Sequence, residues 1–219
     1  MRLERLVAER LGCTRREARR RVRQGDVQVQ GEVVVDPAHR VGPEDVLEVG
    51  GTVAAGPPRL VAYHKPPGVQ CTVGDPHGRP SLREAVGEWL DRGLHPVGRL
   101  DADSEGLLLL SSDGQLTQRL LHPKHGTRKV YEATVEGAVR ADLGARLAGG
   151  VETATGSHAA ELLGVDGQVV RLAVHEGKHR MVRRMLANLG HPVVRLVRLQ
   201  MGSHELGDLA PGATRIVEA

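Results

Sequence analysis

The apolar residues of the first 48 positions follow helix spacing first and strand spacing afterwards. Between Leu3 and Leu11 they recur every three or four residues, the spacing of one helix face, and Gly12 ends that run. Thr14 stands three residues before Glu17, a capping-box pattern that starts a second helix over 15–24. The pattern therefore predicts two consecutive helices at the amino terminus.

The residues after these helices alternate between apolar and polar side chains. Valines occupy every second position on both sides of Gln30–Gly31, which predicts a hairpin of two short strands. Residues 46–49 add one more strand. We expect residues 1–48 to form a small module and residues 49–58, rich in Gly, Ala and Pro, to form a linker.

The remaining chain, 59–219, predicts strands and helices without the regular alternation of a parallel βαβ fold. We expect an α+β fold with a mixed, largely antiparallel sheet and flanking helices. The predicted strands are 60–64, 106–111, 129–136, 159–165, 168–174, 192–200 and 214–217. The predicted helices are 81–91, 113–121, 140–148 and 179–189.

Composition narrows the class of protein. The chain has 219 residues with no Phe, one Trp and two Tyr, so Leu, Val and Ala must build its core. So few aromatic residues argue against modules that stack bases on rows of aromatic rings. Cys13 and Cys71 lack the spacing of a disulfide framework or metal site, which indicates a reducing compartment. No signal peptide or membrane-spanning apolar run is visible, so we expect a soluble, cytoplasmic protein.

Charge is concentrated in two patches although the formal net charge is only +3. Residues 10–23 contain seven Arg and one Glu, and residues 171–198 contain seven basic residues and one Glu. Two basic patches of this density indicate a polyanionic partner. On the helix over 15–24, Arg15, Arg19 and Arg23 form one ridge, with Arg16 and Arg20 beside it.

Acidic residues gather immediately before the buried run Leu107–Leu110. Asp101, Asp103 and Glu105 fall within five positions, and Arg99 precedes them. A polar turn of this kind is commonly structural, with side chains that bond the backbone. Alternatively it holds a carboxylate at a sheet edge as a nucleophile or general base. A divalent-cation site is the third interpretation.

Tyr131 lies on a predicted strand with Lys129 on the same face. Core packing is the default role for a single Tyr. In a chain with so few aromatic rings, Tyr131 is also a candidate wall for a flat substrate. Lys65, in the turn after the strand 60–64, is either a phosphate contact or an ordinary exposed lysine.

The segment His175–His179 matches the H-E-x-x-H signature of zinc proteases. That signature requires one continuous helix, whereas here a strand-like run precedes it and Gly177 interrupts it. We therefore interpret it as a loop that enters a basic helix whose first turn receives phosphate. Arg180, Arg183 and Arg184 are then phosphate contacts, or else a solvated helix face.

Several segments together carry a family resemblance. They are HKPPG (64–68), GRLDADSEGLLLLSSDG (98–114), RKVYEATVEG (128–137), EGKHRMVRRML (176–186) and VVRLVRLQMGSHELGDLAPGATR (193–215). In this order they resemble the RsuA-type pseudouridine synthases. The first 48 residues resemble the small alpha-L RNA-binding module that precedes the catalytic domain in these enzymes.

The resemblance implies an isomerase that converts a specific uridine of ribosomal RNA to pseudouridine without a cofactor or metal. It implies that Asp101 is the catalytic carboxylate, acting on the sugar or on the base. Tyr131 would lie against the target uracil and assist proton transfer, and Arg183 would pair with Asp101. Met181 departs from the family pattern, since many members have Gln there.

The partners implied are ribosomal RNA, either free or in pre-ribosomal particles, and no membrane, with the enzyme a monomer. The expected RNA contacts are Arg15, Arg16, Arg19, Arg20, Arg23, Lys65, Arg99, Lys129, Arg180 and Arg184. Two alternatives stay open. One is a non-catalytic RNA-binding factor for ribosome assembly, and the other is a metal-dependent hydrolase that uses His175 and His179, or Asp101 and Asp103.

Overall fold

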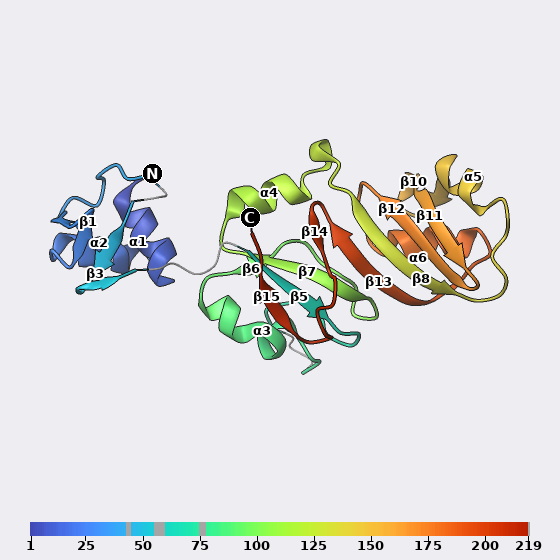
Figure 1. The fold of residues 1–219 in the computed structure, drawn as a ribbon, viewed down its shortest axis with the longest axis horizontal. Coiled ribbons are helices and arrows are strands. Elements are labelled where there is room, and N and C mark those ends of the chain that lie inside the picture. Colours follow the sequence, from blue (N-terminus) through green and yellow to red (C-terminus); the bar gives the residue numbers. More distant parts are fainter. Residues whose placement is uncertain (43–44, 55–59, 75–77, 219) are drawn as a thin grey trace. The chain divides into compact units, whose positions relative to one another are not determined.

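A computed structural model describes residues 1–42, 45–54, 60–74 and 78–218. The chain forms two compact units (Figure 1). One comprises Met1–Arg59 with Gly87–His95, and the other comprises Leu60–Val86 with Pro96–Ala219. Within the described residues, no helix is long and apolar enough to cross a membrane.

The amino-terminal unit contains both predicted helices, α1 (Leu3–Leu11) and α2 (Arg15–Arg23). The capping box is confirmed, because the Thr14 side chain accepts from the Glu17 N–H and the Glu17 carboxylate accepts from Thr14 N–H. A four-stranded antiparallel sheet follows in the order β2-β1-β3-β4. Its strands are β1 (Val27–Val29), β2 (Glu32–Val33), β3 (Leu47–Val49) and β4 (Thr52–Val53).

The predicted hairpin at Gln30–Gly31 is confirmed by the pairing of β1 with β2. The sheet also extends further along the chain than the residue pattern indicated. Gly50 and Gly51 have positive φ angles and turn β3 into β4, so paired strand continues to Val53 inside the segment predicted as linker. Residues 55–58 of that segment lie outside the described residues.

The larger unit is built on a nine-stranded sheet, and this confirms the predicted mixed, largely antiparallel α+β fold. Its main path runs β11-β12-β8-β13-β7-β5-β15. The pairing of β13 with β7 is parallel, and the other pairs on this path are antiparallel. These strands are β5 (Leu60–Lys65), β7 (Glu105–Ser111), β8 (Lys129–Val135), β11 (Glu161–Asp166), β12 (Val169–Val174), β13 (Val193–Met201) and β15 (Thr214–Ile216).

The four predicted helices of this part of the chain also form. They are α3 (Leu82–Asp91), α4 (Gly114–Leu121), α5 (Leu143–Ala148) and α6 (Met181–Asn188). A 3-10 turn η1 (Pro123–His125) follows α4. α3 is kinked at Val86, where the two units divide. The short strands β6 (His95–Pro96), β9 (Val151–Thr153), β10 (Gly156–His158) and β14 (His204–Glu205) were not predicted.

The parallel junction of β7 and β13 depends on Gly106. Its φ angle is +106°, and a Cβ atom there would lie 2.3 Å from the carbonyl oxygen of Arg198. Only glycine therefore permits this approach of the two backbones. Next to this junction, Leu107–Leu110 are fully buried, as their apolar run predicted. The acidic turn before β7 is thus attached to a rigid, buried strand.

Candidate active site

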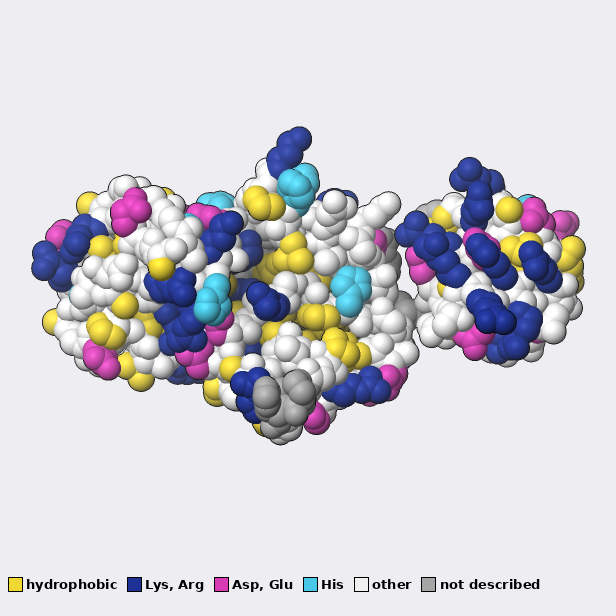
Figure 2. All heavy atoms as spheres, turned by 180° about the vertical axis from the view of Figure 1, so that it is seen from behind, with side chains coloured by type: hydrophobic (Ala, Val, Ile, Leu, Met, Phe, Trp, Pro, Cys, Tyr) yellow, Lys and Arg dark blue, Asp and Glu magenta, His cyan; other side chains and the backbone are white. Residues whose placement is uncertain are grey.

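A cavity of about 480 Å³ lies within the larger unit, where β7, β8 and β13 meet. Its walls come from the segments 70–72, 97–102 and 176–182, and from side chains of β8 and β13. The face drawn in Figure 2 shows hydrophobic and basic side chains close together on this unit. The predicted site residues that line the cavity are Arg99, Asp101, Lys129, Tyr131 and Arg180.

Asp101 is half-buried and lines the cavity. Its backbone carbonyl accepts from Ser104 N–H at 3.1 Å, which closes the turn. Among the described residues its carboxylate makes no hydrogen bond and no ion pair, so the structural interpretation as a side chain that bonds its own turn does not apply to it. The carboxylate is therefore free to meet a ligand.

The side chain of Lys65 bonds this turn from inside the protein, so the prediction that Lys65 contacts RNA is wrong. The side chain is fully buried, and its ammonium donates to the carbonyl oxygens of Pro66 at 2.9 Å, Val69 at 2.8 Å and Ala102 at 3.3 Å. Burial lowers the pKa of Lys65. The lysine thus ties the loop after β5 to the residue that follows Asp101.

The thiol of Cys71 gives the turn a second anchor from the same loop. Its Sγ accepts from the Leu100 N–H at 3.3 Å, one residue before Asp101. Cys71 also lines the cavity, and it is free of any disulfide. The side chains of Lys65 and Cys71 therefore bond the backbone of the residues on both sides of Asp101 and help to fix its position.

Arg183 pairs with Asp103, and this corrects the prediction that it pairs with Asp101. Its guanidinium donates to the backbone carbonyl of Asp103 at 2.8 Å and to that of Val193 at 3.0 Å. Its Nε lies 3.5 Å from the Asp103 carboxylate. Burial lowers the pKa of Arg183, and the charge of Asp103 and, more weakly, that of Asp101 act against this. Arg183, on α6, therefore positions the turn that carries Asp101.

Arg180 forms a two-pronged ion pair with the same Asp103 carboxylate, at 3.0 and 2.8 Å. The hydrogen bond from Arg180 is the main reason that the pKa of Asp103 is lowered. Two arginines thus pair with Asp103, and Asp101 is the carboxylate of this turn that lines the cavity. Within the part of the chain that is described, no group of three or more His, Cys, Asp or Glu side chains could hold a metal ion.

Tyr131 is buried in β8, as core packing predicts, and it also lines the cavity. Its role as a wall for a flat substrate stays a prediction. Its neighbours across the sheet are Leu172 on β12 and Arg198 on β13. Lys129, on the same face, is buried and donates to the Thr127 carbonyl at 2.8 Å. Burial, followed by the charge of Arg198, lowers the pKa of Lys129.

The H-E-x-x-H segment lies in the loop before α6, because that helix begins only at Met181. His175 bonds the Gly126 carbonyl at 2.7 Å, and Glu176 bonds the buried His158 at 2.7 Å. These contacts attach the loop to neighbouring segments, and the loop then forms one wall of the cavity. The side chain of Met181 is buried and lines the cavity beside this loop.

Arg198 and Glu176 line the cavity, although the sequence interpretation named neither as a site residue. Arg198 lies in the predicted strand 192–200, where a charged residue between apolar neighbours is a signal that could have found it. Glu176 was noted only within the zinc-like signature and within the family motif over 176–186. The predicted Arg184 stands apart from the cavity walls and bonds His179 at 3.4 Å.

In the amino-terminal unit, the predicted arginines of α2 are exposed. Figure 2 shows Lys and Arg side chains gathered on one face of this unit. Arg19 differs from the others because its guanidinium forks onto Glu4 of α1, and this hydrogen bond lowers the pKa of Glu4. Among the described residues, Arg15, Arg16, Arg20 and Arg23 make no ion pair and remain available to phosphates.

Comparison with known proteins matches two segments of the chain to two families. Residues 59–188 match the family described as RNA pseudouridylate synthase, and residues 1–47 match the S4 domain. An uncharacterized RNA pseudouridine synthase of Mycobacterium leprae is 40% identical, and the match covers 98% of this chain and 88% of that protein.

Two further relatives carry more specific names. The ribosomal large subunit pseudouridine synthase B of Bacillus subtilis is 34% identical, with 98% of this chain and 91% of the relative covered. The ribosomal small subunit pseudouridine synthase A of Salmonella typhimurium is 35% identical, with 98% and 95% covered. A crystal structure of a pseudouridylate synthase superposes with a TM-score of 0.69 at 31% identity and covers 100% of this chain and 96% of that one. The chain thus belongs to the RNA pseudouridylate synthase family, with an S4 domain at its amino terminus.

Proposed function

We propose that this enzyme converts a uridine of ribosomal RNA to pseudouridine, with Asp101 as its catalytic carboxylate. The observation that carries the proposal is the Asp101 carboxylate in the cavity, without a cation partner among the described residues and beside Tyr131. The relatives named for ribosomal RNA of both subunits support the choice of substrate.

The reaction breaks the bond between C1′ of the ribose and N1 of uracil, turns the base, and joins C1′ to C5. The C5 proton leaves and N1 gains a proton, so the product is an isomer of the substrate. An ionised carboxylate can attack the sugar or the base, or stabilise the positive charge that develops on the sugar. In each case Asp101 must reach a base that has left its stack.

The other residues have positioning and binding roles in this proposal. Tyr131 provides a flat wall for the uracil ring and takes part in proton transfer. Arg183, Lys65 and Arg180 hold the turn around Asp101 through the contacts described above. Arg99, at the cavity wall, is exposed and binds a phosphate of the substrate.

The S4 domain increases affinity by binding the phosphates of a neighbouring RNA helix with the arginines of α2. The enzyme acts as a monomer in the cytoplasm, on ribosomal RNA that is free or part of a pre-ribosomal particle.

The test is to map pseudouridines in ribosomal RNA from cells without the gene, complemented with the wild type or with Asp101→Asn. The wild type should restore one or a few sites, and Asp101→Asn should restore none. Asp208→Asn is a matched control, because that carboxylate is 88% exposed, pairs with Arg215 and lies outside the cavity walls. It should restore the sites fully. Restoration by Asp101→Asn would favour the assembly-factor alternative or another catalytic group.

A further inference from the structure

Arg198 is a buried cation without a counter-ion in the described part of the chain. It lies on β13, is 3% exposed, and donates from Nε to the carbonyl oxygen of Leu107 at 2.8 Å. Its Nη2 is buried and has no hydrogen-bond partner. An unsatisfied donor on a buried charged group is destabilising, so its retention calls for an explanation.

The place of Arg198 in the sheet is fixed by both neighbouring strands. It is the register partner of Tyr131 on β8 and of Gly106 on β7, and the missing Cβ of Gly106 allows the close backbone contact. Its side chain is one of the walls of the cavity, together with those of Tyr131 and Asp101. Arg198 is thus held at the junction of three strands, next to Tyr131 and in the same cavity as Asp101.

A second buried cation lies near Arg198. The nearby Lys129 is also buried and cationic, and repulsion from Arg198 contributes to lowering the pKa of Lys129. Asp103 cannot compensate, since its carboxylate is already held by Arg180 and Arg183. Glu176 acts on Lys129, and Asp101 lines the same cavity, but neither accepts a hydrogen bond from Nη2 of Arg198. This unsatisfied donor indicates that its acceptor comes with the ligand.

We propose that Arg198 donates a hydrogen bond to a carbonyl oxygen of the flipped uracil and stabilises the negative charge of the departing base. The inference rests on the proposed function and adds a second substrate-contacting side chain beside Asp101. When the C1′–N1 bond breaks, its electron pair stays on N1 and the charge spreads to the uracil oxygens. A fixed cation in a buried site stabilises such a charge more than water does.

The depth of Arg198 favours the base over a phosphate as its partner. Arg198 is nearly inaccessible to solvent, whereas the exposed Arg99 and Lys178 at the cavity walls suit the charged backbone of RNA. When a nucleotide is extruded, its base enters the pocket. The deepest cation therefore meets the uracil ring.

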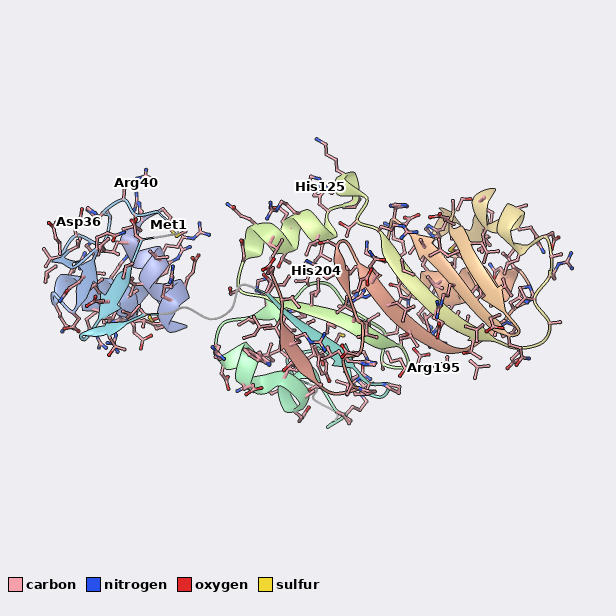
Figure 3. The ribbon with its side chains drawn as sticks, in the orientation of Figure 1. Met1, Asp36, Arg40, His125, Arg195 and His204 are labelled. Atoms are coloured by element: carbon pink, nitrogen blue, oxygen red, sulfur yellow. The ribbon has the colours of Figure 1, made fainter. Side chains whose placement is uncertain are left out.

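The test compares Arg198→Gln with Arg195→Gln. Arg195, labelled in Figure 3, lies on the same strand, but its side chain is 58% exposed, pairs with Glu105 and is not a wall of the cavity. Unmodified transcripts of both ribosomal RNAs serve as substrate, and the single-turnover rate constant and the Kd are measured separately. Arg198→Gln should lower the rate constant about 100-fold. Its Kd should stay within about threefold of the wild type, since backbone phosphates dominate RNA affinity. Arg195→Gln should match the wild type in both.

A change of leaving group separates this role from a structural one. Transcripts made with 5-fluorouridine carry a base that leaves more easily, because fluorine withdraws electrons and stabilises the uracil anion. If Arg198 supplies that stabilisation, the deficit of Arg198→Gln should shrink to about tenfold or less on this RNA, measured as loss of 5-fluorouridine from the target position. Arg198→Lys keeps the positive charge but removes the forked guanidinium, so its single-turnover rate constant on uridine should fall about tenfold. It gives the same comparison if Arg198→Gln does not fold.

Each contrary result has a distinct meaning. An equal deficit on uridine and 5-fluorouridine would show that Arg198 only holds β13 to β7. A deficit in Kd alone would assign Arg198 to a phosphate, and an unchanged rate would assign it no role in the reaction. Each of these overturns the inference while the proposed function stands. A wild-type enzyme that forms no pseudouridine on either RNA would refute the proposed function itself.

Discussion

The two arginine-rich regions of this chain use the same side chain in opposite ways. On α2, Arg15, Arg16, Arg20 and Arg23 are exposed and unpaired within the described residues. Around the cavity, Arg183 and Arg198 are buried, and their guanidinium groups bond backbone carbonyls. Exposed arginines add affinity for a polyanion. Arg183 fixes the geometry of the turn that carries Asp101, and Arg198 is the proposed contact of the uracil base. Substitution of either should therefore lower the reaction rate and leave the affinity for RNA nearly unaltered.

Removal of Arg183 should give the largest effect of the buried set. Arg183→Gln removes donors from the carbonyls of Asp103 and Val193 and loosens the turn that carries Asp101. We expect the single-turnover rate constant to fall by roughly 10²–10³, since a small misplacement of a catalytic group costs about 10²-fold. The Kd for ribosomal RNA should change little. A variant that loses affinity while it keeps its rate would contradict the division between the two regions.

Lys65→Met should lower both rate and stability. The carbonyls of Pro66, Val69 and Ala102 lose a shared donor, which costs about 2 kcal/mol in the free energy of unfolding measured with urea. The rate constant should fall by about 10²-fold, because the same donor holds the Asp101 turn.

The Lys65 variant also has a pH signature. Burial lowers the pKa of Lys65 in the folded state below its ordinary 10.5, so the unfolded chain binds the proton more tightly. The wild type should therefore gain stability as the pH rises from the lowered value to about 10.5, and this gain should be smaller in Lys65→Met. Identical pH profiles for the two proteins would show that the ammonium is not strained by burial.

The smallest effect on the rate should come from the exposed arginines. Changing Arg15, Arg16, Arg20 and Arg23 together to Gln should weaken RNA binding by about tenfold or more and leave the rate constant at saturating enzyme unchanged. Because each lost phosphate contact reduces the slope of log K against log salt by about 0.7–0.9, the slope should fall by up to about 3. Arg19→Gln is the matched control. It breaks the contact with Glu4 and should mainly destabilise the amino-terminal unit.

The sequence predicted the elements better than it predicted the contacts. Apolar periodicity was sufficient for α1, α2 and the main strands, since each has one face or both faces in a core. It missed the hairpin of β9 and β10, whose strands are short and largely exposed. The predicted linker also begins too early. Two consecutive glycines are typical of a linker, but Gly50 and Gly51 form the turn between β3 and β4.

At the site, too, local features could be predicted from the sequence, but contacts between distant residues could not. The acidic turn and Tyr131 could be identified because acidic residues before a buried strand and a rare aromatic residue are local signals. The burial and bonding partners of each basic side chain could not be predicted, because they are set by residues far apart in the chain. Lys65 was expected to contact phosphate, and Arg183 was expected to pair with Asp101. Instead Lys65, on β5, and Arg183, on α6, both bond backbone carbonyls of the turn.

The most direct test of the account is the purified Asp101→Asn enzyme, assayed for both RNA affinity and pseudouridine formation on the same unmodified ribosomal RNA. The account predicts a Kd equal to that of the wild type and no pseudouridine, even at saturating enzyme. Pseudouridine formation at a rate within about tenfold of the wild type would contradict it.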